Sequence, residues 1–167
     1  MGAGKTTIGS KLASHLEKEF FDTDKEIENI TGANIPLIFE LEGEDGFRKR
    51  ETQVLSQLAT KDNILLATGG GIVLRKENRE KLKEHGCVIY LHATLDHLLE
   101  RTAKDRNRPL LQTENPRKTL SDIIQQREPL YREVADVIVE TNDKQIYEIL
   151  QELSKRLLAY QNSQKTH

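Results

Sequence analysis

Cysteine, tryptophan and aromatic residues are scarce in this sequence. The chain of 167 residues has one cysteine, no tryptophan and an aromatic content of 5%. A single cysteine excludes an intrachain disulfide framework and argues against a cysteine-based metal site. Cys87 lies in the short apolar run 87–91 without an evident activating neighbour, which predicts a core thiol rather than a nucleophile. This cysteine usage predicts a reducing compartment, the cytoplasm.

Long hydrophobic runs and an excess of one charge sign are also missing. No apolar stretch approaches the ~20 residues of a membrane-spanning helix, and the amino terminus has no signal-peptide pattern. The net charge is -2 and the pI about 6.2, whereas a nucleic-acid-binding domain is usually basic. The length predicts one domain, residues 1–167. We expect a monomer that binds neither nucleic acid nor membrane.

What the sequence does contain is a regular alternation of short apolar segments and helical patterns. The spacing of Ile8, Leu12 and Leu16 predicts a helix over 5–18. Short apolar runs predict strands at 20–21, 63–67, 88–91 and 137–139. Further helices are predicted at 25–30, 35–59 with an interruption near Gly43 and Gly46, 74–84, 95–101, 120–134 and 146–158. This alternation is typical of βαβ units and predicts an α/β fold with a parallel sheet.

The first seven residues carry most of a phosphate-binding P-loop motif, G-x-x-x-x-G-K-[ST]. Small residues let backbone N–H groups close around phosphate oxygens, and a following helix adds its positive dipole end. Lys5 would reach the β- and γ-phosphates of ATP, and the Thr6 hydroxyl would hold Mg²⁺. A glycine-rich helix start with an exposed lysine is the plainer alternative. We expect ATP to bind through Gly2, Ala3, Gly4, Lys5, Thr6 and Thr7.

The P-loop motif lacks its first glycine and the buried strand that normally precedes it. In folds of this kind that strand lies in the middle of the parallel sheet, paired on both edges. Its loss would leave two neighbouring strands unpaired and open a void in the core. We therefore expect Met1 to be an internal methionine of the P-loop, with roughly ten residues and a short apolar run before it in the natural protein.

Two carboxylates, Asp22 and Asp24, follow the predicted strand at 20–21. In an open α/β sheet, ligands bind beyond the carboxyl ends of the strands. Two carboxylates there can serve a metal ion and a substrate separately. The alternative is that one of them only caps the helix that begins near Lys25, although capping and ligand binding are compatible.

With these motifs in view, the chain resembles the shikimate kinase family. The resemblance covers nearly the whole chain and rests on order and spacing. Its motifs are Gly-Ala-Gly-Lys-Thr-Thr-Ile-Gly at 2–9, Phe-Asp-Thr-Asp at 21–24 with Ile-Glu at 27–28, Ile-Phe at 38–39, Gly-Glu at 43–44, Phe-Arg at 47–48 with Glu51, the glycines at 69–71, Arg-Pro-Leu-Leu at 108–111, and Arg-Glu-Pro-Leu-Tyr at 127–131.

The resemblance implies a P-loop NTPase-type α/β/α sandwich, normally with five parallel strands, and a mobile lid at about 102–116. The P-loop would be residues 1–7 and a substrate-binding helical region residues 23–60. The activity implied is transfer of the ATP γ-phosphate to the 3-hydroxyl of shikimate, with Mg²⁺, in chorismate and aromatic amino-acid biosynthesis.

The resemblance also implies roles for individual residues. Asp24 is the candidate base beside the shikimate hydroxyls, and Asp22 lies near Mg²⁺, through water. Arg48 and Arg127 grip the substrate carboxylate, which suits the planar guanidinium group. The remaining assignments are the backbone of Gly69, Gly70 and Gly71 along the substrate, Arg108 of the lid on the phosphates, and Arg101 on the adenine. Catalysis is thus expected to depend on Lys5, Asp24 and Arg108.

Each of these assignments has a plainer alternative. Arg48 could form surface ion pairs with Glu44 and Glu51, Arg127 and Arg108 could be solvated arginines, and the glycine triplet could be a simple turn. The chain also departs from the family by having Ile146 where proline is usual near the adenine. Two other functions remain open: another small-molecule P-loop kinase, such as a gluconate kinase, and a truncated relative without activity.

Overall fold

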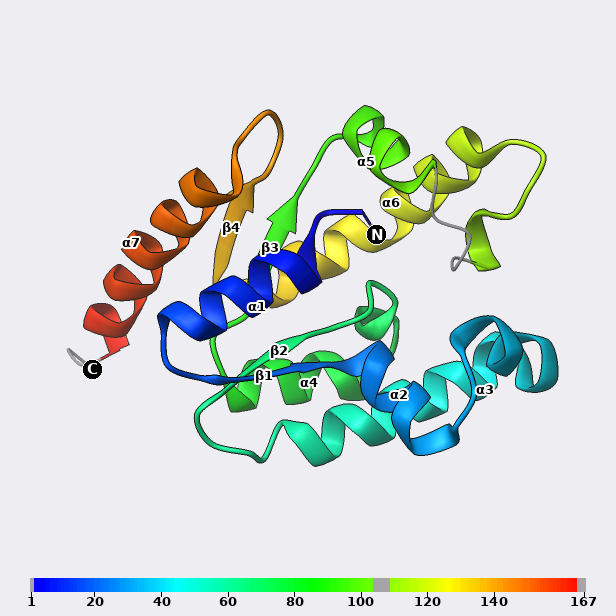
Figure 1. Cartoon of the computed structure of the whole chain (residues 1–167), viewed down its shortest axis with the longest axis horizontal. Coiled ribbons are helices and arrows are strands. Elements are labelled where there is room, and N and C mark those ends of the chain that lie inside the picture. The colour runs from blue at the N-terminus through cyan, green and yellow to red at the C-terminus, as the bar shows by residue number, and fades with distance from the viewer. Residues whose placement is uncertain (1, 104–108, 165–167) are drawn as a thin grey trace.

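The computed structural model describes residues 2–103 and 109–164, in which strands and helices alternate (Figure 1). The strands are β1 (Glu19–Asp22), β2 (Ile64–Ala67), β3 (Ile89–His92) and β4 (Val137–Glu140). The α-helices are α1 (Lys5–His15), α2 (Thr23–Thr31), α3 (Ile35–Leu58), α4 (Lys76–His85), α5 (Leu95–Thr102), α6 (Pro116–Val134) and α7 (Ile146–Gln164). Two short 3-10 helices are η1 (Ile72–Leu74) and η2 (Pro109–Leu111).

Local sequence signals explain where the helices of the first half begin and end. Asp22 caps α2 by accepting hydrogen bonds from the backbone N–H groups of Asp24 and Lys25. Gly32 ends this helix with a left-handed φ of 67°. Asn34 caps α3 through Leu37 N–H. The predicted interruption of α3 occurs at Gly43, which has a φ of 68° and turns the helix before Arg48.

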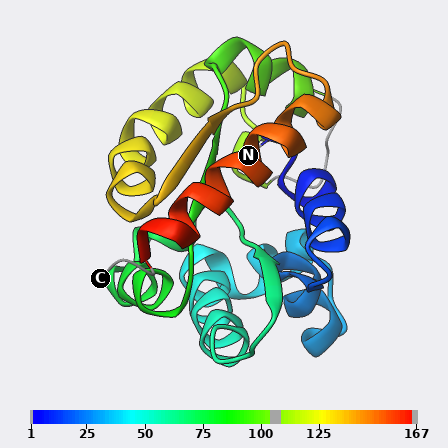
Figure 2. The same ribbon diagram turned by 90° about the vertical axis from the view of Figure 1, so that its left-hand side faces the viewer.

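The strands form two separate parallel pairs. β1 pairs with β2 in a register that aligns Phe21 with Leu66, and β3 pairs with β4 in a register that aligns Leu91 with Val139. α1 packs against β1 and β2 and also meets α7, which lies along β4 (Figure 2). Their shared core consists of Ile8 and Leu12 of α1, Val137 and Val139 of β4, and Ile149 and Leu153 of α7.

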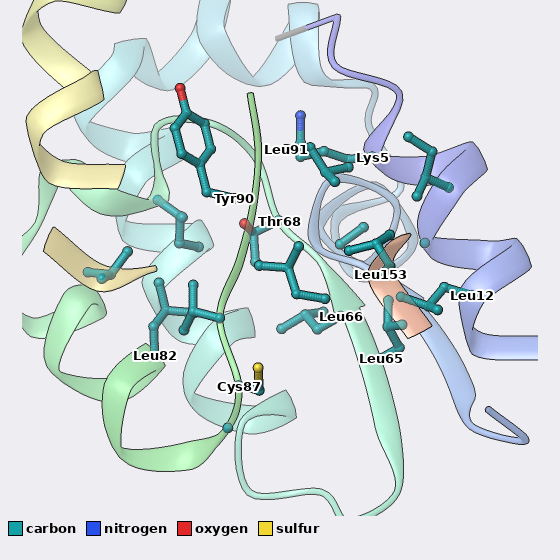
Figure 3. A pocket seen from close by; sticks show the side chains of 18 of the residues that line it. Lys5, Leu12, Leu65, Leu66, Thr68, Leu82, Cys87, Tyr90, Leu91 and Leu153 are labelled. Atoms are coloured by element: carbon teal, nitrogen blue, oxygen red, sulfur yellow. The ribbon is translucent and has the colours of Figure 1, made fainter. Parts of the chain in front are cut away.

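An apolar cavity of about 910 Å³ lies between the two pairs of strands (Figure 3). All four residues of β2 line it, as do Ile89, Tyr90 and Leu91 of β3, whereas β1 and β4 contribute no lining residue. The inner strands are therefore β2 and β3, and the cavity runs between their edges. Within the described residues, neither edge has a third strand beside it.

The sequence predicts most of this architecture. The α/β class, the parallel strands and the position of each predicted strand are confirmed. Several element bounds differ: the first helix ends at His15 and not at residue 18, and α6 begins at Pro116 and not at residue 120. Residues 72–74 form a 3-10 turn before α4, and the last helix continues to Gln164. Among the residues described, no helix is long and apolar enough to cross a membrane.

Candidate active site

The P-loop residues form a left-handed turn that leads into α1. Gly2 has a φ of 71° and Gly4 a φ of 81°, a backbone region that side chains other than glycine rarely adopt. Gly4 caps the helix and its carbonyl accepts from Ile8 N–H at 2.9 Å. A Cβ atom at Gly2 would also lie 3.0 Å from Thr102 of α5. The two glycines thus allow a turn at the positive end of α1, where phosphate is favoured.

Two oxygen atoms suited to a magnesium ion meet beside this turn. The Thr6 hydroxyl donates to Asp22 Oδ2 at 2.7 Å. The other carboxylate oxygen of Asp22 caps α2, so the capping role is observed, and the metal role stays a prediction with which the cap is compatible. Hydroxyl and carboxylate oxygens are ligands that Mg²⁺ accepts together with water and phosphate. The residues present therefore fit the ion.

A buried arginine with two carboxylate partners lies on α3. Arg48 donates from Nη1 to Glu51 Oε2 at 2.5 Å and from Nη2 to Glu44 Oε1 at 2.8 Å. The alternative of ion pairs with Glu44 and Glu51 is thus correct about the partners. Arg48 is only 8% exposed, however, so these are not ion pairs of a surface arginine. Glu51 is fully buried, and this burial raises its pKa, against the lowering effect of Arg48.

The glycine run after β2 lies directly against these charged groups. Gly69 N–H donates to the Thr23 hydroxyl at 3.0 Å. A Cβ atom at Gly69 would lie 2.6 Å from Glu51 Oε1 and 3.0 Å from Asp24 Oδ1. A Cβ atom at Gly71 would overlap the Arg48 guanidinium. The run is therefore more than a turn, because side chains here would displace the arginine and the two carboxylates.

Arg127 enters the same region from α6. It is 4% exposed, so it is not a surface arginine, and among the described residues its Nε has no hydrogen-bond partner. Arg127 also borders a second cavity of about 530 Å³, together with Glu44. A buried guanidinium with a donor left over favours an anionic ligand, because an unmatched buried donor is costly.

Arg101 lies at the opposite side of the P-loop. Its guanidinium donates to the hydroxyl and carbonyl oxygens of Thr141, which follows β4, at 3.2 and 3.0 Å. It also donates to Gly2 O at 3.4 Å. Arg101 therefore connects the P-loop to the segment after β4, the place where the sequence predicts the adenine.

Comparison with known proteins agrees with this geometry. A family profile described as shikimate kinase matches residues 1–158. The chain is 54% identical over 157 residues to a shikimate kinase of Pseudomonas paraeruginosa (strain DSM 24068 / PA7), covering 94% of this chain and 91% of that protein. The chain belongs to the shikimate kinase family.

Solved structures give the same relationship. A shikimate kinase from Acinetobacter baumannii in complex with shikimate is 51% identical, with a TM-score of 0.93 over 96% of this chain and 89% of that chain. A gluconokinase from Sinorhizobium meliloti 1021 has a TM-score of 0.65 at 19% identity, which shows a shared fold alone. The P-loop kinase fold predicted from the sequence is thereby confirmed.

In this member of the shikimate kinase family, the predicted site residues lie in two groups. The glycine run, Asp24, Arg48 and Arg127 surround Glu51, whose pKa depends on the charges of Asp24, Arg48 and Arg127. Thr6 and Asp22 meet beside the P-loop, with Arg101 on its other side. Arg108 lies outside the described residues, so its role stays a prediction.

Two residues of the site received no role from the sequence. Glu51 is part of the motif that resembles the family. Because it follows Arg48 by three residues on a helix, the sequence does indicate the ion pair between them. Tyr131 donates its hydroxyl to Gly70 O at 2.6 Å, and burial raises the pKa of this phenol. No short-range pattern indicates that contact, because the two residues are 61 positions apart.

Proposed function

We propose that this protein transfers the γ-phosphate of ATP to the 3-hydroxyl of shikimate, as a shikimate kinase of aromatic amino-acid biosynthesis. The observation that carries the proposal is that two buried arginines, Arg48 and Arg127, and Asp24 all act on the carboxyl of Glu51, which lies against the glycine run. Shikimate carries one carboxylate and three hydroxyls. The arginines suit the carboxylate, since a guanidinium binds it through two parallel hydrogen bonds, and Asp24 suits the hydroxyls.

Each residue has a defined part in this reaction. Phosphoryl transfer requires mainly positioning and charge stabilisation from the protein. The P-loop amides and Lys5 hold the phosphates, while Asp24 accepts the proton of the attacking hydroxyl. Arg101 holds the adenine side, and Arg108 brings its charge to the phosphates when the lid at about 102–116 closes. The segment near the 3-10 helix η2 belongs to that lid.

Thr6 and Asp22 are the residues that would hold Mg²⁺. Their oxygens are 2.7 Å apart at the start of α1, and Asp22 can act through a bound water. When bound, the ion neutralises charge on the β- and γ-phosphate oxygens. The hydrogen bond between the two side chains keeps both oxygens in place for it.

A coupled assay of ADP release tests the proposal. The 167-residue protein is incubated with ATP and Mg²⁺ and with shikimate, gluconate or no acceptor. The proposal requires ADP release that depends on shikimate. Release with gluconate alone would indicate a different small-molecule kinase, and equal release in all three mixtures would show that no acceptor is used.

A further inference from the structure

Every backbone carbonyl of residues 69–74, which form the glycine run and η1, accepts a hydrogen bond. Two of these bonds stay inside the loop, from Ile72 N–H to Gly69 O at 3.2 Å and from Leu74 N–H to Gly71 O at 3.0 Å. Side chains of α4 and α6 supply the others. These are Asn78 Nδ2 to Ile72 O at 3.0 Å, Arg79 Nη1 to Val73 O at 2.8 Å and to Leu74 O at 3.4 Å, and the Tyr131 hydroxyl to Gly70 O at 2.6 Å.

The amide groups of the glycine run are used differently. Gly69 N–H donates to the Thr23 hydroxyl, whereas the N–H groups of Gly70 and Gly71 have no hydrogen-bond partner in the part of the chain that the structure describes. Gly71 is buried and lies against the Arg48 guanidinium. A buried backbone N–H is rarely left without a partner, so this donor is suited to an oxygen atom of a ligand.

The Gly70 carbonyl and the Gly71 N–H belong to the same peptide unit. A trans peptide unit is planar, and its C=O and N–H bonds point in opposite directions. The hydrogen bond from Tyr131 to Gly70 O therefore also sets the direction of the Gly71 N–H, which points away from the tyrosine. Glycine on both sides gives this unit the widest conformational freedom, so the hydrogen bond is what holds its orientation.

Tyr131 reaches the loop from the face of α6 that carries Arg127. The two residues are four positions apart, about one helical turn. The Tyr131 ring packs against that of Tyr90, with centroids 5.0 Å apart. Burial raises the pKa of the Tyr131 phenol, and the charges of Arg127, Arg48 and Glu51 also act on it. The hydroxyl thus stays protonated, and able to donate, among the charged groups expected to hold the substrate.

We propose that Tyr131 is a positioning residue for the acceptor substrate: its hydroxyl fixes the peptide unit between Gly70 and Gly71, and this unit directs the Gly71 N–H to an oxygen atom of bound shikimate. The inference rests on the proposed function, which identifies the acceptor as shikimate. Tyr131 acts through the loop and not on the reacting atoms. Asn78 and Arg79 hold the carbonyls that follow, so loss of the tyrosine hydroxyl releases one peptide unit and leaves η1 in place.

Tyr131→Phe tests the proposal, because it removes the hydroxyl and keeps the ring. Isothermal titration of the 167-residue protein is expected to show an affinity for shikimate about 5–20-fold weaker, since a buried carbonyl loses its donor. The affinity for ATP is expected to stay that of the wild type. Tyr90→Phe is the matched control, because it removes a hydroxyl from the adjoining ring and leaves the bond between Tyr131 and Gly70 in place.

A second measurement requires no substrate. Nuclear magnetic resonance of protein labelled with heavy nitrogen in its glycines follows the Gly71 amide directly. This resonance is expected to move in Tyr131→Phe, because its peptide unit loses the hydrogen bond at the carbonyl, and to move much less in Tyr90→Phe.

Three results would overturn the proposal. The first is a Tyr131→Phe protein that loses unfolding free energy but binds shikimate as the wild type does, which would show a purely structural role. The second is an equal loss of affinity in both variants, and the third is a Gly71 resonance that does not move. A wild type that binds no shikimate, with a Gly71 resonance that moves as expected, would instead refute the proposed function and leave the fixed peptide unit established.

Discussion

The guanidinium groups of Arg48 and Arg127 are buried in different surroundings. Arg48 has two carboxylate partners, whereas Arg127 retains a donor without a partner among the described residues. Arg127→Lys removes the paired donors but keeps the charge. We expect the KM for shikimate to rise about 10–100-fold, since a charged hydrogen bond contributes about 1.5–3 kcal/mol, while the KM for ATP stays unchanged.

Steady-state kinetics with each substrate varied in turn measures this effect. Arg132→Lys is the matched control, because Arg132 lies on the same helix, is exposed and pairs with Glu128. A shikimate KM that is equal in the Arg127 variant, the control and the wild type would remove Arg127 from the site.

The buried carboxyl of Glu51 predicts a pH dependence of stability. Burial raises its pKa above the ordinary 4.5, so between 4.5 and the folded-state value the native protein binds more protons than the unfolded chain. Stability from this group is therefore complete below pH 4.5 and is lost as the pH rises through that window. Glu51→Gln carries no such titration.

Urea unfolding at several pH values between 4 and 8 compares the wild type, Glu51→Gln and the exposed control Glu100→Gln. The unfolding free energy of the wild type is expected to fall relative to Glu51→Gln as the pH rises. A difference that stays constant or changes in the opposite direction would show that Arg48 outweighs burial at this carboxyl.

At the scale of elements, the loop between β2 and η1 carries the glycines that lie against Arg48, Glu51 and Asp24. Gly71→Ala places a methyl group on the Arg48 guanidinium, so we expect Arg48 to move and shikimate binding to weaken more than tenfold. Isothermal titration with shikimate measures this. Gly86→Ala is the control, because a Cβ atom there meets nothing within 4 Å. Equal shikimate affinity in both variants would contradict the contact.

The P-loop and α1 predict a second effect at this scale. Lys5→Ala is expected to abolish phosphate transfer while the far-ultraviolet circular dichroism stays that of the wild type, because Lys5 acts on the β- and γ-phosphates. Lys11→Ala, at an exposed position of the same helix, should leave turnover unchanged. Wild-type turnover in Lys5→Ala would refute the P-loop interpretation.

The elements themselves follow from the sequence because their signals are local. Apolar runs locate each strand, and Gly43 marks the break in α3 where φ becomes positive. The candidate site required the family pattern, since no periodicity brings Arg127 of α6 close to Glu51 of α3. The contact between Tyr131 and Gly70, and the full burial of Glu51, depend on how α3, α6 and the loop after β2 pack, which no short-range signal records.

At the scale of the whole molecule, the cavity between β2 and β3 is the feature that bears most on the response to pressure. It measures about 910 Å³, is partly open to solvent, and is lined by apolar residues of both strands together with charged residues such as Lys61 and Arg127. Pressure destabilises folded states in proportion to the internal voids that unfolding eliminates. We therefore expect the two pairs of strands to respond to pressure.

Pressure unfolding tests this expectation directly. Unfolding eliminates internal voids, and its volume change is usually about −20 to −100 mL/mol. Because apolar residues form the larger part of the lining, we expect a volume change toward the −100 mL/mol end of this range. Infrared spectroscopy under pressure follows the transition without tryptophan, which the chain lacks. A value near −20 mL/mol for this chain would show that the cavity collapses or fills with solvent in the folded state.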